Sequence, residues 1–108
     1  DLLRIFPNEN AMTNEQKIFE HYGLLHQCKK LNEECYELIE AAIVAHTTEM
    51  TTGDIRNKLL LAIAEELADC FVLMSQIRQH FGIEQSTITD YYKKKIERQL
   101  KRIEDETK

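Results

Sequence analysis

The 108-residue sequence has very little glycine and proline, the two residue types that most often interrupt helices: three glycines and one proline. Pro7, Gly23, Gly53 and Gly82 divide the chain into segments that can each form one helix. No segment alternates apolar and polar residues in the way that is typical of a strand. The pattern therefore predicts an all-α fold, arranged as a four-helix bundle.

Long apolar runs are also absent. The longest, residues 59–64, is far shorter than the ~20 residues that a membrane-spanning helix needs, and Glu65 and Glu66 end it. The start of the chain, Asp1 to Arg4, lacks the basic residues, apolar stretch and cleavage site of a signal peptide. We therefore expect no membrane partner and a cytoplasmic location.

The sequence has fewer basic than acidic residues. With 14 Lys and Arg against 19 Asp and Glu, the net charge is −5, which argues against a nucleic-acid-binding protein because phosphate neutralisation requires a basic surface. The three cysteines, Cys28, Cys35 and Cys70, form no CxxC motif and have no paired histidine spacing, so neither a zinc site nor a disulfide framework is indicated. We expect them to be small core residues.

Four helices are predicted within a single domain, residues 1–108, after an irregular segment over residues 1–12. Thr13 and Gln16 form a capping-box pattern before the first helix, which runs to Tyr22. The second helix covers about 24–46, a loop about 47–54, and the third helix about 54–80. Gly82 is a candidate terminator of the third helix. Ser86 or Thr87 is the candidate cap of the fourth, which ends near residue 104.

The predicted third helix carries apolar residues on more than one side. Such a helix is usually covered on more than one side, and a chain of this length buries only a modest part of its surface alone. We therefore expect oligomerisation to complete the bundle, as a homodimer or homotetramer.

Two carboxylates in this helix fall on its apolar surface. Glu66 lies between Ile63 and Cys70 in the apolar stripe, and Asp69 lies at the edge of the stripe. The second helix repeats the arrangement, since Glu34 and Glu37 border its apolar face. A buried carboxylate is costly unless it is paired, protonated or bound to a metal.

Together the four side chains predict a cation site between the two helices. Because they offer oxygen alone, without histidine or cysteine, they favour Mg²⁺, with Mn²⁺ as a substitute, over zinc or copper. A di-iron site would need Glu-x-x-His at the same spacing. The alternative is that these acids are solvated or paired with basic side chains, namely Lys29, Lys30, Lys95 or Arg98.

The acidic segments follow one another as Glu33-Glu34-Cys35-Tyr36-Glu37 and Glu65-Glu66-Leu67-Ala68-Asp69, and a basic segment with Lys95, Arg98 and Arg102 comes last. They resemble the EExxE, EExxD and K-x-x-R-x-x-x-R segments of the MazG-like all-α nucleotide pyrophosphohydrolases. The resemblance runs from about residue 27 to about residue 103.

The resemblance implies a hydrolase that cleaves a nucleoside triphosphate between its α and β phosphorus atoms, releasing the monophosphate and pyrophosphate. Metal ions held by the four carboxylates would suit this chemistry, which depends on positioning and on charge neutralisation. Glu37 is the candidate to take the proton of the attacking water. Lys30, Lys95 and Arg98 are candidates to hold the phosphates, and Gln27 matches a family position near the nucleotide.

Two other readings remain open. A non-catalytic, dimeric helical interaction module would carry the same acids on its surface, but it would leave Glu66 buried without a partner. A nucleotide sensor would keep the fold and the metal without turnover.

Overall fold

The computed structural model describes residues 13–48 and 53–108, and the predicted irregular segment, residues 1–12, lies outside the described residues. These residues form four helices: α1 (Asn14–Tyr22), α2 (Leu24–Thr47), α3 (Gly53–His80) and α4 (Gln85–Glu106). No strand occurs in the described ranges. The all-α prediction is confirmed, and the second and third helices each extend one residue further into the predicted loop.

Thr13 begins α1 as predicted. Its hydroxyl accepts a hydrogen bond from the Gln16 backbone N–H at 3.1 Å, and the Gln16 side chain accepts one from the Thr13 N–H at 2.7 Å. This capping box satisfies two of the backbone donors that a helix N-terminus leaves free.

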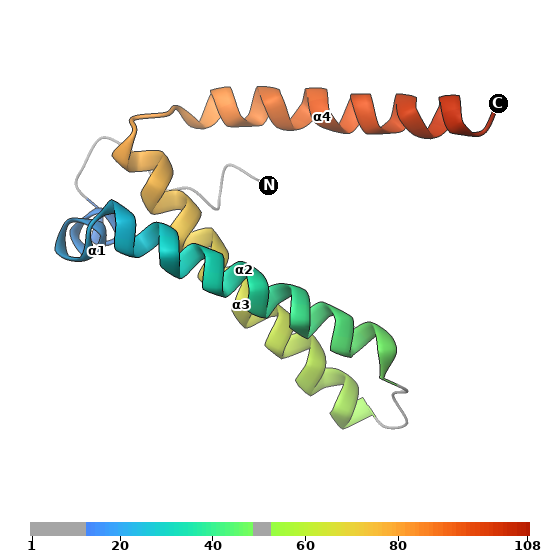
Figure 1. Ribbon diagram of the computed structural model, residues 1–108, viewed down its shortest axis with the longest axis horizontal. Helices are drawn as coiled ribbons and strands as arrows, with labels where there is room; N and C mark the ends of the chain where they lie inside the picture. The colour runs from blue at the N-terminus through green and yellow to red at the C-terminus, as the bar shows by residue number, and fades with distance from the viewer. Residues whose placement is uncertain (1–12, 49–52) are drawn as a thin grey trace.

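Helices α2 and α3 pack along each other as a helical hairpin, and α1 lies against the end where α2 begins and α3 ends (Figure 1). Phe19 of α1 is buried there, with its ring 4.8 Å from that of His80. Gln79 also joins α1 to α3, because its Oε1 accepts from the Thr13 hydroxyl at 2.9 Å and its Nε2 donates to Glu15 at 3.2 Å.

Gly82 ends α3, as predicted. Its φ is +64°, its N–H bonds the carbonyl of Gln79, and the N–H of Ile83 bonds the carbonyl of Arg78. This pair of bonds is the Schellman motif, which requires a residue in the left-handed region. The predicted cap of α4 is wrong: the helix begins at Gln85, before Ser86, because the chain enters it directly through the extended Glu84.

α4 packs against none of the other three helices among the described residues, and Figure 1 shows it extending away from the hairpin. The four helices of one chain therefore do not form a closed bundle. Large apolar side chains remain exposed on all four helices, for example Ile39 at 55%, Leu61 at 69% and Leu100 at 62%. The chain exposes 8437 Å², whereas a monomeric globular protein of its mass exposes about 6200 Å².

The buried apolar core is small. Among the residues that the structure describes, it comprises Phe19, Ala45, Cys70 and Leu73. Cys70 is buried and Cys35 half-buried, as expected of core residues, but Cys28 is exposed, which corrects the prediction for that residue. No helix in the described ranges combines the length and the apolar character needed to cross a membrane.

Candidate metal centre

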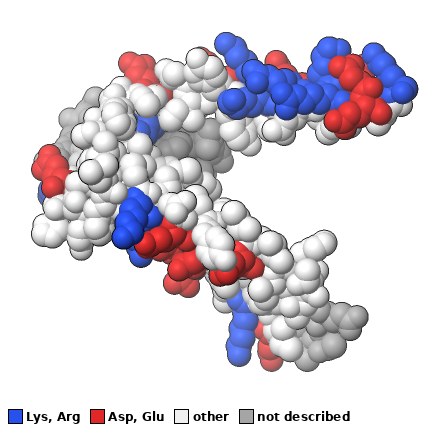
Figure 2. Space-filling model, in the orientation of Figure 1, with Lys and Arg blue, Asp and Glu red and all other residues white. Residues whose placement is uncertain are grey.

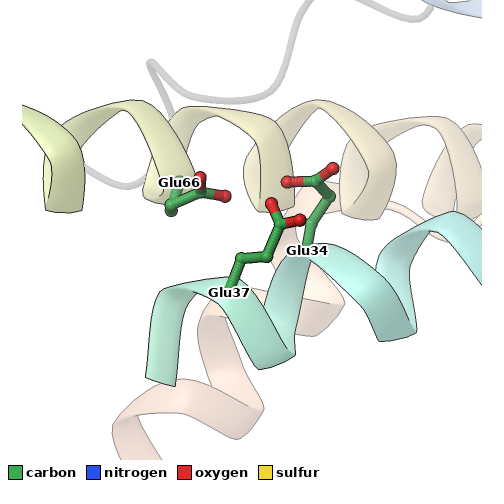
Figure 3. A group of neighbouring side chains, drawn as sticks. All are labelled: Glu34, Glu37 and Glu66. Atoms are coloured by element: carbon green, nitrogen blue, oxygen red, sulfur yellow. The ribbon is translucent and has the colours of Figure 1, made fainter. Parts of the chain in front are cut away.

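Three carboxylates converge in the middle of the helical hairpin. Glu34 and Glu37 project from α2, one turn apart, and Glu66 faces them from α3 (Figure 3). One oxygen from each of the three lies within 4.8 Å of the others. The structure thus brings together three of the four predicted metal ligands, including Glu37, the predicted catalytic residue.

The Glu34 and Glu66 carboxylates are incompletely satisfied. Glu34 is only 6% exposed, and Glu66 is partly buried. The Oε2 atoms of both are buried, and no donor in the described part of the chain bonds either of them. Carboxylate oxygens are acceptors only, so neighbouring carboxylates cannot satisfy one another unless a proton or a cation lies between them.

The pKa values of Glu34 and Glu66 are shifted in opposite directions. The contact with Glu34, together with burial and the nearby charges of Glu37 and Asp69, raises the pKa of Glu66 to about 7. The pKa of Glu34 is lowered, chiefly because the protonated Glu66 carboxyl donates to it and Lys30 lies beside it. In the absence of a metal and below about pH 7, the pair therefore shares one proton, held mainly by Glu66.

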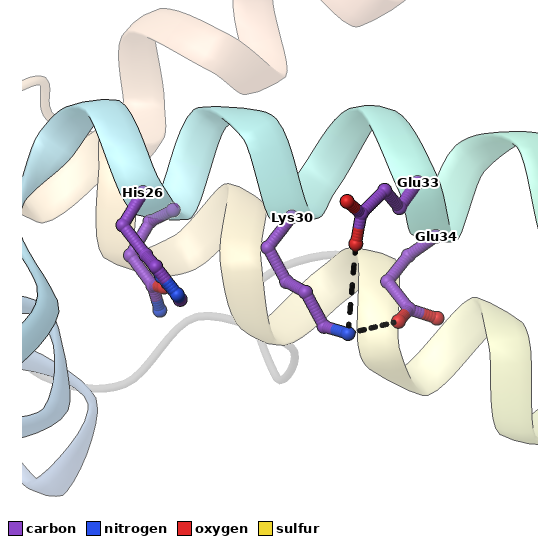
Figure 4. Close-up of polar contacts among 5 residues, drawn as sticks. His26, Lys30, Glu33 and Glu34 are labelled. Carbon is purple, nitrogen blue, oxygen red and sulfur yellow. Dashed lines mark hydrogen bonds and ion pairs between the residues drawn. The ribbon is translucent and has the colours of Figure 1, made fainter.

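Lys30 is the nearest cation on α2. Its Nζ lies 3.3 Å from Glu34 and 3.8 Å from Glu33 (Figure 4). The hydrogen bond to Glu34 and the charge of that carboxylate raise the pKa of Lys30. The predicted phosphate-binding lysine is thus adjacent to the carboxylates and engaged in ion pairs, and its half-exposed side chain lines the cavity beside them.

Asp69 lies one turn after Glu66 on α3 and is not among the three converging carboxylates. It lines a cavity together with Glu34. Burial, followed by the charge of Glu34, raises the pKa of Asp69, so the two groups interact. Asp69 is therefore positioned beside the centre, in the cavity wall.

Gln27 is 4% exposed and donates from Nε2 to Gln76 Oε1 at 2.7 Å. The predicted substrate-binding glutamine therefore lies in the cavity wall, paired with a second glutamine from α3. The sequence reading missed Gln76. The available signal was its position three residues after Leu73, on the buried face of the helix.

The two other predicted phosphate-binding residues, Lys95 and Arg98, lie on α4. Figure 2 shows Lys and Arg side chains along this helix, apart from the carboxylates of the hairpin. Since α4 packs against no other described helix, the structure does not bring Lys95 and Arg98 to the acidic residues within one chain.

The donor set fits a hard cation. Three carboxylates with two unsatisfied buried oxygens provide the oxygen ligands that Mg²⁺ and Mn²⁺ prefer. Cys70 lies close by, with its Sγ 3.9 Å from that of Cys35, but burial raises the pKa of the Cys70 thiol to about 11. A thiol that stays protonated is a poor ligand for a soft metal.

Comparison with known families, with curated proteins and with solved structures finds no match to this chain.

Proposed function

We propose that the chain is a Mg²⁺-dependent nucleotide pyrophosphohydrolase of the MazG-like type, which also accepts Mn²⁺ and acts in the cytoplasm. Its substrate would be a nucleoside triphosphate, cleaved to the monophosphate and pyrophosphate. The observation that carries the proposal is the convergence of Glu34, Glu37 and Glu66, in which the Oε2 atoms of Glu34 and Glu66 are buried and bonded by no donor of the described residues. The resemblance of the acidic and basic segments to that family indicates which reaction the site would catalyse.

The carboxylates of the hairpin have distinct roles in this proposal. Glu34 and Glu66, each with a buried Oε2 atom, would hold the cation most rigidly, and Asp69 would complete the ligand set from the cavity wall. Bound Mg²⁺ would neutralise phosphate charge and acidify a water molecule. Glu37 is the exposed member of the cluster, so its carboxylate can reach a water and take its proton.

Basic groups are needed on the side of the phosphates that faces away from the bound cation. Once Glu34 is engaged by the cation, the ammonium of Lys30 is released from its ion pair and can turn towards a phosphate. Lys95 and Arg98 can contribute only from another copy, because α4 extends away from its own hairpin.

We include self-association as a homodimer or homotetramer in the proposal. The unpartnered α4 and the apolar side chains exposed on α2 and α3 support it, as does the excess of exposed surface over that of a compact monomer. Sedimentation velocity at micromolar concentration should give a species larger than the 12.7 kDa chain. A single species of monomer mass would contradict this part of the proposal.

The direct test is to incubate the protein with Mg²⁺ and a panel of ribo- and deoxyribonucleoside triphosphates, and to measure monophosphate and pyrophosphate. Glu66→Gln and Glu34→Gln should each lower turnover by at least about 100-fold. Glu65 of α3 and Glu40 of α2 are matched controls, because both are exposed and lie outside the cluster and the cavity. Glu65→Gln and Glu40→Gln should remain within about threefold of the wild type. Absence of pyrophosphate from every nucleotide would refute the enzymatic function.

One observation favours a second candidate. An amphipathic helix that packs against no other described helix of its chain, as is the case for α4, is suited to binding another protein in a non-catalytic interaction module. That candidate predicts no dependence on Mg²⁺. A nucleotide sensor would instead bind Mg²⁺ and nucleotide without releasing pyrophosphate, so the same incubation, combined with a binding measurement, separates the three functions.

A further inference from the structure

A cavity of about 500 Å³ lies beside the carboxylates, and residues of α1, α2 and α3 line it. Tyr22 and His26 are in its wall, as are Glu34 and Asp69. Its volume is within the range of about 300–1000 Å³ found for small-molecule sites. The cavity therefore has room for an organic group next to whatever the carboxylates hold.

Two aromatic side chains contribute to this wall as a stacked pair. The rings of Tyr22 and His26 are 4.7 Å apart and inclined by 16°. They belong to different helices, and the Gly23 backbone between them, with φ +86°, sets the angle at which α1 meets α2. Tyr22 is 53% exposed and His26 is also exposed, so the pair is accessible to a planar ligand.

The groups follow one another along one side of α2. His26, Lys30 and Glu34 are spaced four residues apart, and Figure 4 shows them in this order along the helix. At 1.5 Å of rise per residue, His26 and Glu34 are about 12 Å apart along the axis. An aromatic surface, a cation and the carboxylates thus occur in the order of the base, the phosphates and the metal of an extended nucleotide.

The polar groups deeper in the cavity are paired with one another or with His26. Gln27 Oε1 lies 2.8 Å from His26 Nδ1, and Gln27 Nε2 donates to Gln76. The exposed surface of the ring pair, by contrast, is apolar and offers stacking rather than hydrogen bonds. Stacking on aromatic faces tolerates any base, because every base has a π surface.

We infer that Tyr22 and His26 form the base-stacking end of the substrate site and that the site accepts nucleotides with little discrimination between bases. The inference rests on the proposed function for the position of the phosphates. The base lies against the ring pair, and the phosphates lie along α2 towards Lys30 and Glu34.

The test uses the metal-free, full-length protein and the 5′-monophosphates of adenosine, guanosine, cytidine and uridine. Saturation-transfer NMR should show contact with the base protons of all four nucleotides. Tyr22→Ala should weaken binding by about 5- to 100-fold for each base. Tyr22→Phe, which keeps the ring, should bind within about twofold of the wild type. The matched control is Tyr36→Ala, since Tyr36 is an exposed tyrosine of α2 outside this cavity.

The inference is overturned if the base protons receive no saturation, or if Tyr22→Ala weakens binding no more than Tyr36→Ala. It is also overturned if the loss depends strongly on the base. Should Tyr22→Ala fail to fold, Tyr22→Leu keeps the apolar volume without the π surface, and the same loss is expected. Because the monophosphates bind without turnover, an unaffected Tyr22 variant in an active enzyme would refute the stacking site alone. A wild type that binds nucleotides but releases no pyrophosphate would refute the catalytic function alone.

Discussion

Metal binding should displace the proton that Glu34 and Glu66 share. The pKa of Glu66 is about 7, and a carboxylate must be ionised to bind a metal. At pH 6 a group with this pKa is about 90% protonated, so Mg²⁺ binding should release about 0.9 proton per site, against about 0.1 at pH 8. The same equilibrium makes the affinity for Mg²⁺ about tenfold weaker at pH 6 than at pH 8.

Titration calorimetry in two buffers of different ionisation enthalpy measures this release directly. The Glu65→Gln variant should behave as the wild type does, because Glu65 is exposed and outside the cluster. In the metal-free protein, carboxyl ¹³C shifts should show a titration near pH 7 that Glu66→Gln abolishes. The reasoning fails if Mg²⁺ binds at pH 6 without releasing protons, or if the titration near pH 7 survives the Glu66→Gln substitution.

Three further predictions concern stability. The raised pKa of Glu66 contributes stability that is present below its ordinary value of 4.5 and lost as the pH rises through about 7. Thermal unfolding of the metal-free protein should therefore shift to lower temperature over this window, and Glu66→Gln should remove that shift relative to the wild type. Thr13→Ala removes the capping hydroxyl and should lower the free energy of unfolding by about 1 kcal/mol in denaturant titrations, whereas Thr13→Ser should have little effect. Gly23→Ala should cost about 1–3 kcal/mol because of its positive φ. Gly53→Ala, at the start of α3, has no such requirement and should be near neutral or slightly stabilising; equal effects at the two glycines would contradict the backbone-strain explanation.

Local sequence signals predicted where α1 begins and where α3 ends, because the relevant interactions span only a few residues. The capping box of Thr13 and the left-handed turn at Gly82 each depend on neighbours within one helical turn. The start of α4 was missed because Ser86 is a favourable cap type, yet the extended conformation of Glu84 begins the helix before it. Residue type indicates where a cap is favourable, not which position the preceding turn makes available.

The carboxylate cluster could be predicted because helical periodicity relates residues on one face. Glu34 and Glu37 share a face of α2, and Glu66 lies in the apolar stripe of α3, so packing of these two faces brings them together. Periodicity does not say what covers a face. For that reason Cys28 was assigned to the core but is exposed, and the predicted bundle includes α4, which packs against no other described helix of its chain.

Lys95 and Arg98 can serve the carboxylates only if another copy of the chain supplies them, because α4 lies away from its own hairpin. Co-expression of the Glu66→Gln and Arg98→Gln variants in equal amounts tests this. If sites are shared between two copies, half of the dimers combine the variants and keep one intact site each, so about a quarter of the wild-type activity should return. If each copy builds its own site, every site carries one of the two substitutions and no activity returns above that of the separate variants. A fully active Arg98→Gln variant would exclude this arginine from the site in either arrangement.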